Sequence, residues 1–112
     1  MPNKPNRIGR KLFGEILKKG MSCSGEFLYI KFITLSGEEK RYSFVVSKKI
    51  SKKAVIRNLI KRRARHVIKN NLTSIKTGYA IVFFFNKKEV VGLSFNQIEQ
   101  DILKVLKKAR LC

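Results

Sequence analysis

Residue types that carry metal, disulfide and membrane chemistry are rare or missing in this chain of 112 residues. Cysteine occurs only at Cys23 and Cys112, without the spacing of a metal site, and His66 is the one histidine. Tryptophan is absent, and no apolar run approaches the ~20 residues that a membrane-spanning helix needs. These absences argue against a disulfide framework, a metal site on the chain, a membrane partner and a secretory signal, and they fit a reducing cytoplasm.

Acidic residues are also scarce. Seven Asp and Glu stand against 26 Lys and Arg, which gives a formal net charge of +19, and none of the seven lies between residues 40 and 88. A surface that is merely solvated usually mixes both signs of charge. The imbalance therefore predicts a polyanionic partner.

The usual sets of catalytic residues are missing as well. The sequence shows no paired carboxylates, no cysteine–histidine pair and no glycine-rich phosphate loop. We therefore predict no catalytic residue on this chain.

The chain does contain enough apolar material to fold. Hydrophobic residues make up 44% of it, with eight phenylalanines and three tyrosines, whereas a disordered basic tail is poor in aromatic residues. Its length suits one domain with one modest core. We expect a single domain over residues 1–112, with a flexible start at residues 1–7.

Apolar periodicity and turn residues predict alternating helices and strands. Lys18 and Lys19 before Gly20 are typical of a helix C-terminus, and Ser94 with Gln97 forms a capping box. The aromatic-rich segments on either side of SGEEK are predicted to pair as a hairpin. We expect helices at 8–19, 52–71 and from 94 onward, and strands at 26–35, 41–49 and 79–85, with room for an extra short strand within 27–35. The class is α/β or α+β, a two-layer sandwich with a mixed sheet of about four strands.

The segment YAIVFFF at residues 79–85 is apolar at every position. Such a run indicates a strand that is covered on both faces. Phe83, Phe84 and Phe85 are therefore interpreted as core residues rather than as a platform for stacking bases.

The segment at residues 52–71 combines an apolar stripe with eight uncompensated cations. At about 100° per residue, Ile56, Ile60, Ala64 and Val67 fall on one side of the helix. The polar residues fan across another side, where like charges four residues apart repel each other unless phosphates lie opposite. The pattern predicts a helix that grips a nucleic acid backbone, and it leaves DNA, RNA and an anionic membrane open.

The segment VVSKKISKKAVIRNLIKRRAR at residues 45–65 closely resembles the signature of the bacterial ribonuclease P protein subunit. The resemblance extends to the helix that carries Phe13, to the strands and to the last helix, and so covers nearly the whole chain. It implies an α/β sandwich with a left-handed crossover between parallel strands, an exception to the usual hand. It also implies that one copy of the protein binds one catalytic RNA. In this complex the RNA cuts the 5′ leader from precursor transfer RNA, and the RNA binds most of the Mg²⁺ that the reaction needs.

The resemblance assigns two sets of binding residues. Contacts to the catalytic RNA fall on Arg57, Asn58, Lys61, Arg62 and Arg65, and we add Lys52, Lys53 and Arg63 of the same cationic stretch as further candidates. Contacts to the leader fall on Phe13, Leu17, Leu28, Tyr29, Ile30, Ser47, Lys48 and Lys49, where the strand register leaves Leu28 with Ile30, or Tyr29, as alternatives.

The chain departs from the family pattern at two positions. Leu17 stands where a second aromatic residue is common, and Leu59 stands where the motif usually has its second arginine. Arg63 lies one helical turn after Leu59, so it either replaces the missing cation or extends its stem beside the core. The alternative functions are a structural protein of the ribosomal type, which would bind RNA without assisting cleavage, and a protein that compacts DNA.

Overall fold

The computed structural model describes residues 7–112, so the predicted flexible start lies outside it except for Arg7. The α+β class with a mixed four-stranded sheet is confirmed. The elements are α1 (Arg10–Lys19), β1 (Met21–Ser24), β2 (Leu28–Thr34), β3 (Lys40–Val46), α2 (Ala54–Asn70), the 3-10 helix η2 (Leu72–Ser74), β4 (Tyr79–Phe85), the 3-10 helix η3 (Lys88–Gly92) and α3 (Phe95–Lys108).

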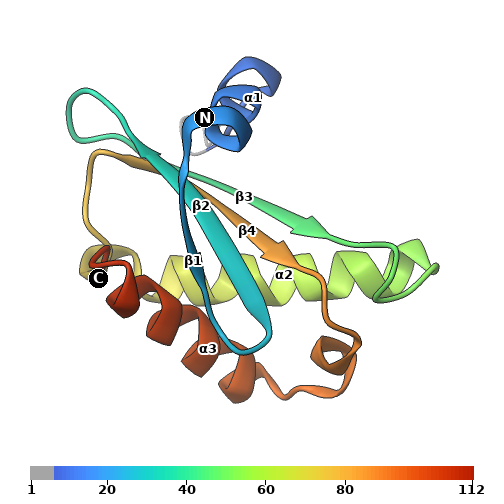
Figure 1. Ribbon diagram of the computed structural model, residues 1–112. Helices are drawn as coiled ribbons and strands as arrows, with labels where there is room; N and C mark the ends of the chain where they lie inside the picture. The colour runs from blue at the N-terminus through green and yellow to red at the C-terminus, as the bar shows by residue number, and fades with distance from the viewer. Residues whose placement is uncertain (1–6) are drawn as a thin grey trace, which may run out of the picture.

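The strand order in the sheet is β1-β2-β4-β3 (Figure 1). Strand β4 runs antiparallel to β2 and parallel to β3, and α2 connects the two parallel strands. The predicted hairpin between residues 26–35 and 41–49 is therefore wrong, because β4 lies between them. The reason is that β4 is apolar along its whole length, which suits a strand in the middle of the sheet with helices packed on both of its faces.

The fourth strand is β1, and it lies outside residues 27–35, where an extra strand was expected. It pairs with β2 at the edge of the sheet, and three of its four residues are exposed. A short polar edge strand has no apolar alternation to reveal it.

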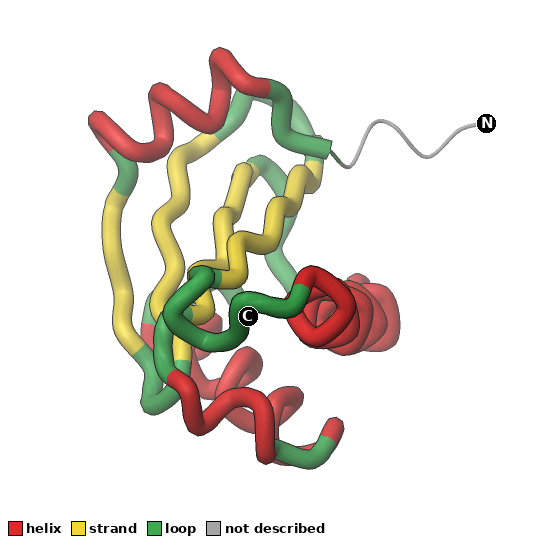
Figure 2. Tube along the Cα trace, turned by 90° about the vertical axis from the view of Figure 1, so that its right-hand side faces the viewer, coloured by secondary structure: helices red, strands yellow, loops and turns green. Residues whose placement is uncertain are grey.

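Helices cover both faces of the sheet, with α2 and α3 on one side and α1 on the other (Figures 1 and 2). The main core lies on the α2 and α3 side, where Ile81, Phe83 and Phe85 of β4 are buried. Ala80 and Val82 of the same strand are buried against α1 on the opposite side. Successive residues of β4 thus serve two separate cores, as the period of two in a strand requires.

The helix ends follow the predicted signals with one difference. The capping box of α3 is present: the Ser94 hydroxyl accepts from the Gln97 backbone N–H at 3.2 Å, and the Gln97 side chain accepts from the Ser94 N–H at 2.9 Å. Gly20 ends α1 as the sequence indicated, but its φ of −65° is not the left-handed conformation that glycine often adopts at this position. Glycine is needed there because a Cβ would clash with the Ile16 carbonyl oxygen.

Candidate nucleic-acid interface

Helix α2 is held against the sheet by the predicted apolar stripe. Ile60, Ala64 and Val67 are buried together with Ile68, and Ile56 is half-buried at the beginning of the helix. Burial of these side chains supplies the stability that the charged sequence cannot, because its like charges repel one another.

The opposite face of α2 carries its cations without acidic partners. Residues 7–112 contain one ion pair, between Arg41 and Glu39, and it lies outside α2. The side chains of Asn58, Arg62 and Arg65 are exposed, and that of Lys61 is half-buried. This face therefore presents positive charge that no side chain of the described range neutralises, which favours phosphate groups as partners.

Two arginines of α2 have structural contacts of their own. Arg57 donates from Nη1 to the Ser51 carbonyl at 2.8 Å, and Arg63 donates from Nη1 to the Leu93 carbonyl at 3.3 Å. Leu59 is 36% exposed on the helix surface. Arg63 thus ties α2 to the loop before α3, and whether it also replaces the cation missing at position 59 stays a prediction.

The segment between β3 and α2 places further cations at the end of the sheet where β3 and β4 finish. Ser47 extends the β3–β4 ladder by donating its N–H to the Phe85 carbonyl at 3.0 Å, and its hydroxyl accepts from the Lys49 N–H at 3.1 Å. Lys48 and Lys49 are exposed beyond this turn. The positive charge of the segment adds to the partial positive charge of the α2 N-terminus.

Lys52 and Lys53 continue this cationic segment and are both exposed. Lys53 occupies the N-cap position of α2 without a side-chain hydrogen bond, and the first turn contains no acidic residue. The beginning of α2 therefore lacks the negative charge that usually compensates the helix dipole.

Three aromatic side chains gather on the α1 side of the sheet, and we call Phe13, Tyr29 and Phe84 the aromatic row. The rings of Tyr29 and Phe84 are stacked, with centroids 4.8 Å apart and planes at 8°. Phe13 of α1 lies with its ring centroid 6.3 Å from that of Phe84. All three are half-buried, so each ring retains exposed surface on which an unpaired base can stack.

The observed register decides between the alternatives on β2. Leu28 and Ile30 are 3% and 0% exposed in the core under α2 and α3, so the prediction that they line the leader site is wrong. Side chains alternate along a strand, which places Tyr29 on the α1 side instead. Leu17 is 44% exposed on α1, one turn after Phe13.

Phe84 was interpreted from the sequence as a core residue, together with Phe83 and Phe85, and its place in the aromatic row was missed. Phe83 and Phe85 are core residues as predicted, but Phe84 points to the opposite face and is only partly buried. The signal was the strand period of two: within three consecutive residues, the middle one must face away from its neighbours. Its stacking on Tyr29 depends on strand pairing that the sequence does not show.

The cationic segment before α2 and the aromatic row share one end of the sheet. Tyr29 and Val45 both pair with Phe84, so the three residues form a line across β2, β4 and β3. Ser47 and the beginning of α2 follow directly after this line along the chain. The structure thus brings the predicted Phe13, Tyr29 and Ser47–Lys49 to one end of the sheet, whereas α2 begins at this end and carries its cations along the opposite face.

Two further observations limit what the site contains. Within residues 7–112, no three side chains of His, Cys, Asp or Glu gather closely enough to hold a metal ion. No helix in this part of the chain is both long and apolar enough to cross a membrane.

Comparisons with known proteins agree on one family. The ribonuclease P family model matches residues 1–110. The ribonuclease P protein component of Alkaliphilus oremlandii is 34% identical over 99 residues, covering 88% of this chain and 85% of the relative. That of Syntrophomonas wolfei is 32% identical over 99 residues, covering 88% and 82%.

Solved structures show the same fold. The Staphylococcus aureus RNase P protein matches with a TM-score of 0.84 and 28% identity, covering 95% of this chain and 96% of that one. The Thermotoga maritima RNase P protein matches with a TM-score of 0.83 and 29% identity, covering 91% and 96%. With sequence, site geometry and fold in agreement, the chain belongs to the family of ribonuclease P protein components.

Proposed function

We propose that this chain binds the catalytic RNA of ribonuclease P and the 5′ leader of precursor transfer RNA, and thereby assists removal of the leader. The observation that carries the proposal is the presence of two different surfaces on opposite faces of the same sheet, joined by the cationic segment at residues 47–53. One is the uncompensated cationic face of α2, and the other is the aromatic row.

The two surfaces suit two kinds of RNA. Arginines on a rigid helix contact phosphate oxygens at fixed spacing, which suits a folded RNA whose backbone is ordered. A half-exposed aromatic row suits unpaired nucleotides, because each base that stacks on a ring gains about 1–3 kcal/mol. The leader is the single-stranded part of the precursor, so the aromatic row is assigned to it and α2 to the catalytic RNA.

The protein's part in this proposal is binding rather than bond cleavage. The hydrolysis is assigned to the RNA with bound Mg²⁺, in keeping with the finding that residues 7–112 contain no group of three His, Cys, Asp or Glu side chains that could hold a metal. Lys48 and Lys49 would attract the leader backbone beside the aromatic row. We assign one protein to each RNA.

Reconstitution tests the proposal. The purified chain is mixed with the catalytic RNA of its source and a precursor transfer RNA at low magnesium, where binding by the protein should raise the rate of 5′ cleavage. Binding of the RNA without any rate enhancement would favour a structural protein of the ribosomal type instead.

The role of α2 is tested by the salt dependence of affinity for the catalytic RNA. Arg62→Ala and Arg65→Ala should each lower the slope of log K against log salt by about one, because each removes one phosphate contact. Lys107→Ala is the matched control, since Lys107 is an exposed cation on α3. Equal slopes for all three variants would remove α2 from the interface.

A further inference from the structure

A groove of about 620 Å³ lies between β3, the second half of α2 and residues 7–8. Its volume falls within the range of about 300–1,000 Å³ that is usual for small-ligand sites. Strand β3 is an edge strand of the sheet, so the groove runs along an edge that no other strand covers. The aromatic row contributes nothing to its walls.

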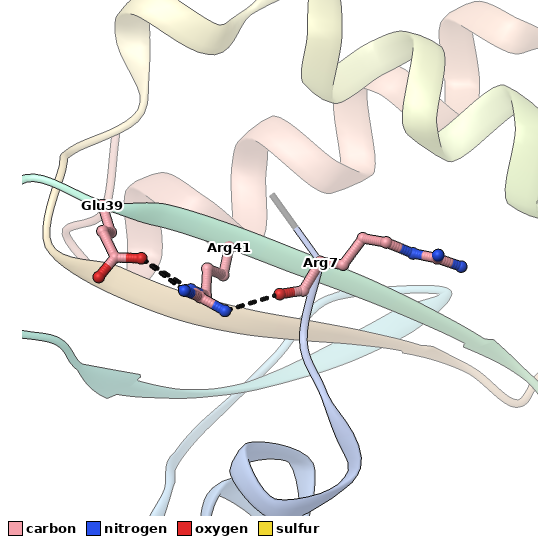
Figure 3. A network of polar contacts seen from close by, with 3 residues as sticks. All are labelled: Arg7, Glu39 and Arg41. Carbon is pink, nitrogen blue, oxygen red and sulfur yellow. Dashed lines mark hydrogen bonds and ion pairs between the residues drawn. The ribbon is translucent and has the colours of Figure 1, made fainter. Parts of the chain in front are cut away.

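One wall is formed by the start of the described chain, which β3 holds in place. Arg7 forms a parallel bridge with Tyr42, and its carbonyl accepts from Arg41 Nη1 at 3.2 Å. The Arg41 guanidinium is itself fixed by two hydrogen bonds to Glu39, at 2.9 and 2.7 Å (Figure 3). The Arg7 side chain extends away from this network, so its charge remains available to the groove (Figure 3).

The lining combines cations with apolar and aromatic walls. The three cations are Arg7, Arg65 and Lys69, and the ion pair found in residues 7–112 involves none of them. The guanidinium of Arg65 lies 6.0 Å from the centroid of the Phe44 ring. Ile8, Phe44, Ile68 and Leu72 supply the apolar surface. Such a lining suits a ligand that has a flat apolar part and a negative charge.

Tyr42 adds a polar group that lacks a partner. Its side chain lines the groove, and its hydroxyl is buried without a hydrogen bond to any part of residues 7–112. Burial raises the pKa of Tyr42 to about 12, so the group remains a neutral hydroxyl, able to donate, at neutral pH. A buried hydroxyl without a partner is unfavourable, and a small movement of this wall that admits a polar atom of a ligand would supply the missing bond.

We propose that this groove binds one unpaired nucleotide, with its base against Phe44 and the Tyr42 wall and its phosphate beside Arg7 and Lys69. Inorganic phosphate alone would leave the apolar walls uncovered, and an uncharged apolar ligand would leave the cations unpaired. An unpaired nucleotide of the catalytic RNA and a free mononucleotide share this chemistry. The choice of the RNA as the source rests on the proposed function, whereas the ligand chemistry of the groove does not.

Titration of the free protein with uridine and adenosine 5′-monophosphates tests the ligand class. At physiological salt, the backbone amide signals of Ser43, Phe44 and Lys69 should shift in ¹⁵N-resolved NMR spectra, and inorganic phosphate should shift them much less. Shifts confined to the aromatic row, or no shift of any groove residue at millimolar nucleotide, would overturn the inference.

Tyr42→Phe separates a ligand role from a structural one. It should weaken nucleotide binding about threefold to tenfold, the usual effect of one hydrogen bond, while leaving thermal stability equal or higher because a buried unpaired hydroxyl is gone. Lower stability with unchanged nucleotide affinity would mean that the hydroxyl serves the fold. Lys69→Gln should also weaken the nucleotide, and Lys107→Gln on α3 should not.

Competition with the catalytic RNA identifies the source of the nucleotide. If the RNA supplies it, the RNA displaces the bound mononucleotide and Tyr42→Phe weakens RNA binding by the same factor. If the ligand is a free nucleotide, the mononucleotide and the catalytic RNA bind to the protein at the same time. RNA binding and enhanced cleavage without any nucleotide or Tyr42 effect would remove only this inference, and nucleotide binding without enhanced cleavage would remove only the proposed function.

Discussion

The two faces of the sheet differ in how completely helices cover them. On one face, α2 with 17 residues and α3 with 14 residues enclose the main core. On the other face, α1 has 10 residues and leaves Tyr29 and Phe84 half-exposed. The same central strand contributes large aromatic residues to both faces. Side-chain size and hydrophobicity therefore do not distinguish a residue that stabilises the fold from one that is available to a ligand; the area of the helix layer above it does.

Replacing adjacent phenylalanines of β4 tests this comparison most directly. Phe83→Ala should lower the free energy of unfolding by about 3–5 kcal/mol, because Phe83 is fully buried. Phe84→Ala should cost less than about 2 kcal/mol of stability, since part of its ring is already in water, but should weaken binding of precursor transfer RNA. Urea unfolding and precursor affinity measure the two effects. Equal stability losses would show that the α1 face is as closed as the other.

The face covered by α2 and α3 can also be tested at Asp101, which is the one buried charged residue among residues 7–112. Its carboxylate accepts from the Glu26 and Phe27 backbone N–H groups at 2.9 and 2.8 Å, and so fixes the turn between β1 and β2 to α3. Asp101→Ala should cost about 3 kcal/mol, because two charge-assisted hydrogen bonds are lost. Asp101→Asn retains one acceptor and should cost about half as much in thermal or urea unfolding. A loss below about 0.5 kcal/mol for Asp101→Ala would contradict this role.

Tyr42, at the edge of the face that α2 and α3 cover, makes the stability of the fold depend on pH. Burial raises its pKa from 10.0 to about 12, so the folded chain retains the phenol proton at a pH where the unfolded chain has released it. Its contribution to stability is full below pH 10 and is lost as pH rises through about 12, a decrease of at most about 2.5 kcal/mol. The difference in unfolding free energy between the parent and Tyr42→Phe should therefore change over this interval. A constant difference from pH 9 to pH 12 would refute it.

Phe13 tests the open face. Phe13→Ala should weaken binding of precursor transfer RNA by about 1–2 kcal/mol and leave mature transfer RNA almost unaffected, because only the precursor has a leader to stack. Leu17→Phe, one turn along α1, should strengthen precursor binding by adding a ring. Filter binding with both RNAs measures the difference. Equal losses for precursor and mature RNA would exclude leader contact at Phe13.

The smallest expected effect concerns the end of α3, the helix that helps to close the main core. Arg110 has φ 63°, and the Leu111 N–H bonds the Leu106 carbonyl at 2.8 Å, so the helix ends in a Schellman motif with an arginine at the usual glycine position. Arg110→Gly should raise stability by about 0.5–1 kcal/mol, because glycine adopts this conformation without strain. Arg110→Ala is the control and should give no gain in thermal unfolding.

Local patterns allowed the helices, most strand positions and the cationic face of α2 to be predicted. The apolar stripe of α2 and the capping box of α3 depend on residues a few positions apart, so the sequence alone displays them. Phe13 and Tyr29 could also be named from the sequence as candidate leader-binding residues. The resemblance named them, and the structure places their rings beside the same phenylalanine, Phe84.

The pairing of strands that are far apart in the chain could not be predicted from such local patterns. Whether β2 pairs with β3 or with β4 depends on which strand can be covered on both faces, and the choice also determines which of Leu28 and Tyr29 enters the core. A shift of one residue in a strand exchanges its two faces. The groove beside β3 brings Arg7, Tyr42 and Lys69 together from three segments, so no spacing in the sequence indicates it.

The central position of β4 also affects how the chain can fold during synthesis. Leu28 pairs with Phe85 and Lys40 pairs with Tyr79, so the middle of the sheet joins segments that are made far apart in time. We expect β1 and β2 to pair early, while β3 waits without a strand partner and α2 waits without a completed sheet to pack on. The last strand to emerge from the ribosome therefore decides whether the sheet forms, and until then two strand edges stay open to other chains.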